Sequence, residues 1–319
     1  MQTAPVFVSS GDVIADRRFE FAKDLEKRGE LAGAADLYAQ AAELAPAFAS
    51  AWFALGMARA RLGDADGAAA AFGQAVTVDP NDRHGAALAL ARLTGEPAPM
   101  PAGYVRALFD QYAKHFDLSL LEGLNYRGPQ LLFDAVMTVC NVIGREDRFD
   151  RAFDLGCGTG LVSAMFCKRI DSLVGVDLSP VMVEQARRTG IYNHLQVAEV
   201  RDFLTREHDA SADLVIAGDL LPYVCDLAPI AGEVGRVLED GGLFALTTET
   251  HEGAGVLLRE TLRYAHGEAH VREALASGGL VPVHFQQTHY RTEKGSPVPG
   301  LVVVAVKAAS TAPSSVGTS

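Results

Sequence analysis

An internal repeat near the start of the chain constrains the fold more than any other feature of the sequence. Two alanine-rich copies, RGELAGAADLYAQAAELAP and RLGDADGAAAAFGQAVTVDP, align at an offset of 34 residues. Small residues recur where two helices of a hairpin would approach closely, and an aromatic residue in the next turn would fill the gap. A proline would then end the second helix, because it lacks a backbone donor. The sequence therefore predicts helical hairpins over residues 15–48 and 49–82 and a closing helix over residues 83–93. The matching pairs are Gly29 and Gly63, Gly33 and Gly67, Ala34 and Ala68, Tyr38 and Phe72, Ala41 and Ala75, and Pro46 and Pro80.

The second copy resembles the tetratricopeptide repeat, which has the same 34-residue period. Its matching residues are Trp52, Leu55, Gly56, Ala68, Phe72, Ala75 and Pro80. The first copy matches less closely, because Arg18 stands where the family has tryptophan. An unrelated alanine-rich helical bundle is the alternative interpretation. Such stacks need about three repeats to be stable, so we expect residues 1–94 to form a helical domain that leans on the rest of the chain or on a second copy.

The segment after the repeats has the composition of a linker. Residues 95–103, GEPAPMPAG, contain three prolines and two glycines, which favour a loop. Apolar residues then recur at a spacing of four and predict a helix with one aromatic face. These residues are Tyr104, Leu108, Tyr112 and Phe116. We expect a second domain over residues 104–308, and the low-complexity tail over residues 309–319 is expected to be disordered.

Short apolar runs alternate with helical stretches from Arg151 onward. The runs RAFDL, SLVGVDL, LQVAEV, DLVIAG and GLFALTTE begin five β-α units, and VPVHFQQTHY and GLVVVAVK follow as a hairpin. The expected helices include residues 161–170, 255–265 and 270–279. This order predicts an α/β fold with a Rossmann-like, doubly wound sheet of seven strands that has an antiparallel edge.

Composition excludes several classes of protein. Apolar residues make up 49% of the chain and charged residues 21%, which is too apolar for wholesale disorder. The formal net charge of −12 gives no general attraction to phosphate groups, so we expect no nucleic-acid or membrane partner. We find no secretory signal and no stretch near the roughly 20 apolar residues of a membrane span, which indicates a cytoplasmic protein.

The cysteines give no sign of a metal site or a disulfide framework. The chain has four, and none forms a C-x-x-C pair. We therefore expect reduced thiols and no bound metal. The four are Cys140, Cys157, Cys167 and Cys225.

The segment FDLGCGTGL lies between the first expected strand and the helix after it. It carries Asp154 followed by Gly156, Gly158 and Gly160. Glycines let the backbone turn tightly and approach a ligand without a Cβ in the way, and the next helix offers unpaired N–H groups at its start. The dinucleotide fingerprint has a different spacing, G-x-G-x-x-G, and a carboxylate before the first glycine would repel a pyrophosphate. The loop therefore suits a nucleoside with a cationic amino group better than it suits NAD.

Acidic residues stand at the tips of the next three expected strands. Asp177 ends the second strand, where a carboxylate can accept hydrogen bonds from both hydroxyls of a ribose. Glu199 follows the third strand and Asp219 follows the fourth.

These segments resemble the class I S-adenosylmethionine-dependent methyltransferases. The resemblance covers about residues 104–307 and is most specific over residues 153–161 and 173–182. The segments FDQYAKHFD, AGDLLPYVCDLAP and RYAHGEAHVREAL are similar to a bacterial group in which tetratricopeptide repeats precede the methyltransferase domain.

The resemblance implies S-adenosylmethionine as the cofactor and gives roles to the first strand tips. Asp154 and the loop Gly156–Gly160, with Gly158 at its centre, would hold the methionine part. Asp177 would hold the ribose, and Asp219 would line the pocket near the sulfonium and the acceptor.

The resemblance also assigns residues to the adenine. Leu178 and Met182 would pack on its faces, and Glu199 with the Val200 amide would contact its edge. This chain has Ala198-Glu199-Val200 where the family has G-D-A. Tyr112, on the aromatic helix, would close over the cofactor.

The implied reaction is methyl transfer by in-line displacement to an acceptor that the sequence does not identify, a small molecule or a protein. A general base is needed only for an acceptor that is protonated at neutral pH. Asp219 and then His266 are the candidates, the latter because imidazole titrates near neutrality. The repeats would bind a protein partner or mediate homodimer formation. The alternatives are an inactive adaptor that acts through its repeats and an NAD-dependent oxidoreductase, which the glycine spacing disfavours.

Four of the assigned residues also have a purely structural interpretation. Glu199 could be a solvated strand end, and Asp219 could cap the following turn. Tyr112 could be ordinary core packing, and His266 could be a core or surface histidine.

Overall fold

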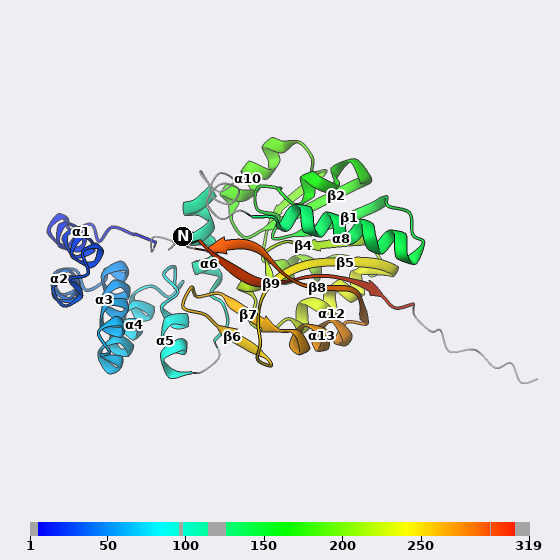
Figure 1. The fold of residues 1–319 in the computed structure, drawn as a ribbon. Helices are drawn as coiled ribbons and strands as arrows, with labels where there is room; N and C mark the ends of the chain where they lie inside the picture. Colours follow the sequence, from blue (N-terminus) through cyan, green and yellow to red (C-terminus); the bar gives the residue numbers. More distant parts are fainter. Residues whose placement is uncertain (1–5, 96–97, 114–125, 294, 310–319) are drawn as a thin grey trace, which may run out of the picture. The chain divides into compact units, whose positions relative to one another are not determined.

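The computed structural model describes residues 6–95, 98–113, 126–293 and 295–309 (Figure 1). The chain divides into two units. The first is built from residues 1–114 with residues 258–264, and the second from residues 115–257 and 265–319. The boundary between the two units does not fall at the expected linker over residues 95–103, because the helix after that linker belongs to the first unit. In the described part of the chain, no helix combines the length and the apolar character needed to cross a bilayer.

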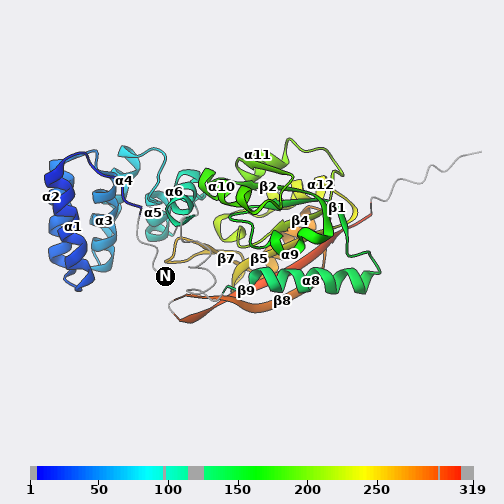
Figure 2. The same cartoon turned by 90° about the horizontal axis from the view of Figure 1, so that it is seen from above.

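The first unit is a stack of helices in the order of the sequence (Figures 1 and 2). Its helices are α1 (Val13–Lys27), α2 (Leu31–Leu44), α3 (Ala49–Arg61), α4 (Ala65–Val78), α5 (Ala86–Thr94) and α6 (Ala102–Tyr112). Helices α2 and α4 begin and end 34 residues apart, so the two predicted hairpins are confirmed.

Close packing inside each hairpin explains the residue types of the repeat. The rings of Phe53 and Phe72 have centroids 5.8 Å apart, and a Cβ on Gly56 would lie 2.5 Å from the Phe72 ring. Only glycine fits this contact. Gly29 and Gly63 both adopt a φ of +83° in the turns between paired helices, a conformation that favours glycine.

Helix α6 belongs with the repeats and does not begin the second domain as predicted. Its last residue lies 34 positions after the last residue of α4, so α5 and α6 occupy the places of a third helical pair. A Cβ on Gly103 would lie 1.9 Å from the carbonyl oxygen of Asn81, and the Tyr104 ring packs over Gly85. Helix α6 therefore packs on the turn between α4 and α5. The continuation of this predicted helix through Phe116 lies outside the described residues.

A mixed sheet forms the second unit. Strands β3, β2, β1, β4 and β5 run parallel in that order, β9 pairs antiparallel with β5, and β8 pairs antiparallel with β9. The predicted doubly wound sheet with an antiparallel edge is thus confirmed, but β6 and β7 extend it beyond the seven strands expected. The strands are β1 (Phe149–Leu155), β2 (Ile170–Asp177), β3 (His194–Val197), β4 (Ala212–Ala217), β5 (Leu238–His251), β6 (Val256–Leu258), β7 (Tyr264–Gly267), β8 (Leu280–Glu293) and β9 (Ser296–Lys307).

Helices cover both faces of this sheet (Figure 2), and the strands are correspondingly apolar on both sides. On one face Phe153 of β1 packs with α11, α12 and α13. On the other face Ala152 of the same strand packs with α8 and α9. The helices of this unit are α8 (Gly128–Ile143), α9 (Ser163–Phe166), α10 (Pro180–Thr189), α11 (Val200–Leu204), α12 (Ala228–Val237) and α13 (Glu268–Ser277).

The prediction of a helix over residues 255–265 is wrong. The segment forms β6, a turn and β7 instead, because β5 continues to His251 and its end pairs with β7 at Thr250 and His266. Leu262 adopts a φ of +55° in the turn, a conformation that no helix contains. The helix predicted over residues 161–170 is also shorter than expected, since α9 gives way to a single 3-10 turn.

Candidate active site

The glycine loop after β1 makes the tight bend that its sequence predicts. Gly156, Gly158 and Gly160 have φ values of +67°, +53° and +94°, all in the left-handed region that favours glycine. A Cβ on Gly156 would also lie 3.0 Å from the Leu220 side chain, which belongs to the loop after β4. The bend therefore brings the backbone of the loop to the carboxyl edge of the sheet, where Leu220 and Tyr192 lie close to it.

Asp177, at the end of β2, is bonded directly to this loop. Its Oδ2 accepts a hydrogen bond of 2.9 Å from the N–H of Gly158, and its Oδ1 accepts one of 2.8 Å from the N–H of Ser179. Burial raises the pKa of Asp177 to about 6. Its carboxylate thus holds the loop in place. It lies at the tip of β2, where the sequence analysis expects a ribose.

Asp154, at the end of β1, is held by two hydroxyl groups. Its Oδ2 accepts hydrogen bonds of 2.6 Å from Ser163 Oγ and 2.7 Å from Tyr192 OH. Burial raises the pKa of this carboxyl. Both of these bonds go to the same oxygen, Oδ2. The sequence analysis did not identify either hydroxyl partner.

Asp219, directly beyond β4, has a strained backbone. Its φ is +56°, which is uncommon for a residue with a side chain. The conformation is held because its N–H donates to Thr247 Oγ1 at 2.8 Å, while its Oδ1 accepts from Tyr290 OH at 2.8 Å. The following 3-10 turn is preceded by Leu220 and has no side-chain cap, so the interpretation of Asp219 as a helix cap is wrong. Strain of this kind is concentrated at functional sites.

A buried polar cluster surrounds Asp219. Arg291 is 1% exposed, forms an ion pair with Glu249, and has its Nε 3.8 Å from Asp219 Oδ1. The rings of Tyr126 and Tyr290 meet edge to face, with centroids 6.1 Å apart. Burial raises the pKa of both phenols well above the usual value. Both tyrosines are therefore neutral hydrogen-bonding groups at physiological pH.

This cluster escaped the sequence analysis because of a strand irregularity. Consecutive residues of a regular strand point to opposite faces. The pairing of β8 with β9 shifts register between His289 and Arg291, and Tyr290 and Arg291 are both buried. A β-bulge redirects side chains in this way, and simple alternation of residue types does not reveal it.

The tips of β1, β2 and β4 meet at one place. The charges of Asp219 and Asp154 both act on Tyr126, and the charge of Asp154 also acts on Asp177. The site thus gathers three carboxylates, and the guanidinium of Arg291 pairs with both Glu249 and Asp219. Such a site attracts a cationic ligand.

The four residues that the sequence analysis assigned to the adenine differ in how far they are exposed. Leu178 is half-buried, whereas Met182 is fully buried and has no exposed surface to offer a ring. Glu199 is exposed and caps α11, since its Oε2 accepts from the N–H of Asp202 at 3.0 Å. Val200 is buried behind it. Leu178 is therefore the best placed of these four to contact a ligand.

His266 is a buried residue of β7, and Tyr112 belongs to the first unit. His266 lies on β7 with no exposed surface, its Nε2 is 3.1 Å from the Leu221 carbonyl oxygen, and burial lowers its pKa to about 4. Titration near neutrality, the reason for proposing it as an acid or base, therefore does not apply. Tyr112 ends α6 in the first unit, and its closure over a cofactor stays a prediction.

Among the residues that the structure describes, no group of three or more histidine, cysteine, aspartate or glutamate side chains is placed to hold a metal ion. All four cysteines are free thiols. Cys157, inside the glycine loop, is buried, and burial raises its thiol pKa well above the usual value.

Comparison with known proteins agrees with this geometry. Residues 153–246, from β1 into β5, match a family model described as a methyltransferase domain. Residues 49–82 match a model of the tetratricopeptide repeat. The part of the chain from β1 into β5 is thus similar to a methyltransferase domain. A tetratricopeptide repeat precedes that domain, at the hairpin of α3 and α4.

The names of individual relatives of the methyltransferase domain refer to different molecules. Ribosomal protein L11 methyltransferase of Clostridium botulinum is 35% identical over 102 residues, which are 31% of this chain and 32% of the relative. Malonyl-[acyl-carrier protein] O-methyltransferase of Salmonella typhimurium is 30% identical over 143 residues, 44% of this chain and 54% of the relative. The chain thus spans a third to about half of the length of these relatives.

A solved structure similar to the chain is the Burkholderia thailandensis 1,6-didemethyltoxoflavin-N1-methyltransferase with bound 1,6-didemethyltoxoflavin and S-adenosylhomocysteine. It is 20% identical, with a TM-score of 0.47, and the match covers 67% of this chain and 93% of that one.

Proposed function

We propose that this protein transfers a methyl group from S-adenosylmethionine to an acceptor by in-line displacement. The observation that carries the proposal is the hydrogen bond from the Gly158 N–H to Asp177. It joins a glycine loop with three positive φ values to a carboxylate at the tip of the next strand. Together with Asp154 these groups make a cradle for a nucleoside that carries a cationic amino acid.

The residues present fit this cofactor. Asp154 Oδ1 would accept from the amino group, and the backbone of the Gly156–Gly160 loop would lie against the methionine part. Asp177 would accept from the ribose hydroxyls. Leu178 would pack on the adenine, and Glu199 and the Val200 amide are proposed to contact its edge. When bound, the cofactor supplies an electrophilic methyl group on a positively charged sulfur.

The chain's own residues would then orient the acceptor. Asp219 is the proposed acceptor-side group, because its backbone is strained and its carboxylate is held by Tyr290. Its Oδ1 accepts the hydrogen bond from Tyr290 OH, so Oδ2 is the oxygen that would accept a proton or a hydrogen bond from an acceptor. Aligning a nucleophile behind an electrophilic carbon can supply roughly 7–11 kcal/mol of the barrier.

The acceptor remains either a small molecule or a protein in this proposal. The helical pairs α1 to α4 would mediate a protein interaction or homodimer formation. Nothing in the site favours an inactive adaptor, because the glycines and both cradle carboxylates are in place. The spacing of the glycines and the gathered carboxylates disfavour NAD, whose pyrophosphate is anionic.

Isothermal titration calorimetry of the full chain tests the cofactor. We expect S-adenosylmethionine and S-adenosylhomocysteine to bind with one site per chain and NAD not to bind. Binding of NAD in preference to S-adenosylmethionine would refute the proposal.

A second experiment addresses the acceptor. Lysate from a strain that lacks the gene is incubated with the full chain and methyl-labelled cofactor, and the small-molecule and protein fractions are counted separately. An Asp219→Asn variant that binds the cofactor normally is the control. Label in one fraction, lost with the variant, would assign both the acceptor class and the role of Asp219.

A further inference from the structure

Three side chains occupy equivalent positions in successive repeats of the first unit. Asp16, Ser50 and His84 are each 34 residues apart. Asp16 lies in the first turns of α1, Ser50 lies in the first turn of α3, and His84 lies just before α5. They therefore form a row across the stack with one polar group per repeat.

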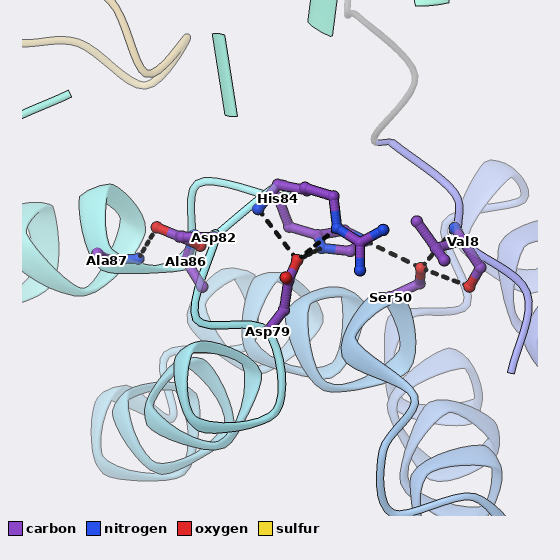
Figure 3. A network of polar contacts seen from close by, with 8 residues as sticks. Val8, Ser50, Asp79, Asp82, His84, Ala86 and Ala87 are labelled. Carbon is purple, nitrogen blue, oxygen red and sulfur yellow. Dashed lines mark hydrogen bonds and ion pairs between the residues drawn. The ribbon is translucent and has the colours of Figure 1, made fainter. Parts of the chain in front are cut away.

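The segment just before α1 runs along this row. The N–H of Ser10 donates to Asp16 Oδ1 at 2.9 Å. The N–H of Val8 donates to Ser50 Oγ at 2.9 Å, and Ser50 Oγ donates to the Val8 carbonyl oxygen at 3.1 Å. The backbone of Val6 lies near the His84 imidazole. Two residues of the segment thus correspond to one repeat of the stack. Figure 3 shows the central contact, in which Val8 and His84 both meet Ser50.

The side chains of the segment follow the same period. Val6, Val8 and Ser10 are half-buried, and the residues between them are exposed, as expected when an extended chain lies on a surface. Phe7, between them, still reaches two rings of the repeats, with centroids 5.3 Å from Phe19 and 6.1 Å from Phe48. The backbone of Val8 and Ser10 makes three hydrogen bonds to the row, and the hydroxyl groups of Ser9 and Ser10 also donate to Asp16.

Ser50 and His84 of the row lie near a further aspartate, Asp79, but these three residues do not form a hydrolytic triad. Ser50 Oγ lies 2.9 Å from His84 Nε2, while His84 Nδ1 is 3.8 Å from Asp79, beyond hydrogen-bond distance. Ser50 is 2% exposed and its hydroxyl is enclosed by the backbone of Val8. No substrate carbonyl could reach it while the segment is in place.

We propose that the row of Asp16, Ser50 and His84 is a receptor for an extended peptide, and that residues 6–10 are a resident strap that occupies it. The ligand class is an extended segment with a β-branched or small residue at every second position and an aromatic residue between them. A segment of another protein with this pattern binds when the strap leaves. The inference does not depend on methyl transfer.

Because the strap belongs to the same chain as the row, it occupies the row in preference to peptides that bind weakly from solution. A short covalent link holds the segment near its site at an effective concentration in the millimolar range. A peptide in solution must exceed that concentration or bind more tightly. Removing the strap should therefore reveal a site that the intact chain conceals.

The test uses a fluorescent peptide with the sequence of residues 3–12, measured by anisotropy. Three proteins are compared: the full chain, a variant that lacks residues 2–11, and a full-length Val8→Pro variant. The deletion retains Asp12, which caps α1 by accepting from Ile14 and Ala15. Proline at position 8 removes the N–H that Ser50 accepts and unseats the strap without shortening the chain.

We expect both variants to bind the peptide saturably, at least about tenfold more tightly than the full chain. Ser50→Ala in the deletion background removes two hydrogen bonds to the peptide and should weaken binding by about tenfold. A peptide that itself carries proline at position 8 is the matched control and should bind more weakly.

Equal binding by the full chain and both variants would overturn the proposal. So would failure of the Val8→Pro variant to bind while its helical circular dichroism matches that of the full chain. Light scattering is run on the same samples, because a dimer that the deletion dissolves would place the segment on a second copy and overturn an intramolecular strap.

Discussion

The phenol of Tyr290 donates a hydrogen bond of 2.8 Å to Asp219, a residue 71 positions earlier in the chain. The bond joins β8, in the antiparallel part of the sheet, to the loop after β4. Gly300 makes room for it, because a Cβ at that position would lie 2.2 Å from the Tyr290 ring. The acceptor side of the proposed site is thus built from both the parallel and the antiparallel parts of the sheet.

Tyr290→Phe should reduce turnover more than it reduces stability. The variant keeps the ring and its contact with Gly300 but removes the donor that orients Asp219. A hydrogen bond to a charged group is worth roughly 1.5–3 kcal/mol, so kcat should fall by about tenfold or more while cofactor affinity stays unchanged. Steady-state kinetics and calorimetry measure the two quantities. An equal loss of cofactor affinity would mean that Tyr290 supports the whole site and not Asp219 in particular.

Arg291→Met should destabilise the second unit. Glu249 is 1% exposed and pairs with Arg291, so the substitution removes the guanidinium that pairs with this buried carboxylate. Breaking a buried ion pair costs roughly 3–5 kcal/mol. Chemical unfolding measures this loss, and the double variant Arg291→Met with Glu249→Gln is the control, since it removes the stranded charge. If the double variant is no more stable than the single one, the ion pair is not the cause.

Local features of the sequence were sufficient to predict much of the fold and part of the site. The 34-residue period specified the hairpins, because the same packing contact recurs in each. The glycine loop and Asp177 were predicted because backbone conformation and strand order bring them together without long-range information.

The remaining features depend on tertiary contacts that local patterns do not encode. Tyr192 and Tyr290 reach their carboxylates from distant segments, and a bulge in β8 directs Arg291 inward. The pKa of His266 departs from its usual value because β7 is buried, and the sequence predicted a helix there. The third helical pair was missed because α6 shares helix boundaries with the repeat but not its residue types.

Cofactor binding should weaken as the pH falls through about 6. Burial raises the pKa of Asp177 to about 6, and only the ionised carboxylate accepts from both ribose hydroxyls. The affinity should therefore be highest above pH 7 and decline toward pH 5. Calorimetry with S-adenosylhomocysteine across this range measures the effect. Asp177→Asn should bind weakly at every pH, and a variant that kept the wild-type pH dependence would assign the titration to another group.

Gly158→Val should abolish cofactor binding, whereas Gly190→Val should not. Both glycines have positive φ, +53° and +70°, so a β-branched residue strains either backbone by roughly 1–3 kcal/mol. Gly190 ends α10, and a Cβ there would meet nothing within 4 Å. Of these two glycines, it is Gly158 whose N–H donates to Asp177. Thermal unfolding should show similar losses for the two variants, while calorimetry should separate them. Loss of binding in both would indicate that strain alone is responsible.

Gly56→Ala should destabilise the repeats, and Gly73→Ala should stabilise them slightly. Both glycines lie inside helices, but a Cβ on Gly56 would be 2.5 Å from the Phe72 ring, whereas a Cβ on Gly73 would meet nothing within 4 Å. Overpacking of this kind costs roughly 1–3 kcal/mol, and replacing an unobstructed helical glycine by alanine gains roughly 0.5–1 kcal/mol. Unfolding followed by circular dichroism at 222 nm measures both changes. Phe72→Leu in the Gly56→Ala background frees space at the contact and should recover part of the loss. If it recovers none, the ring is not what excludes a side chain at position 56.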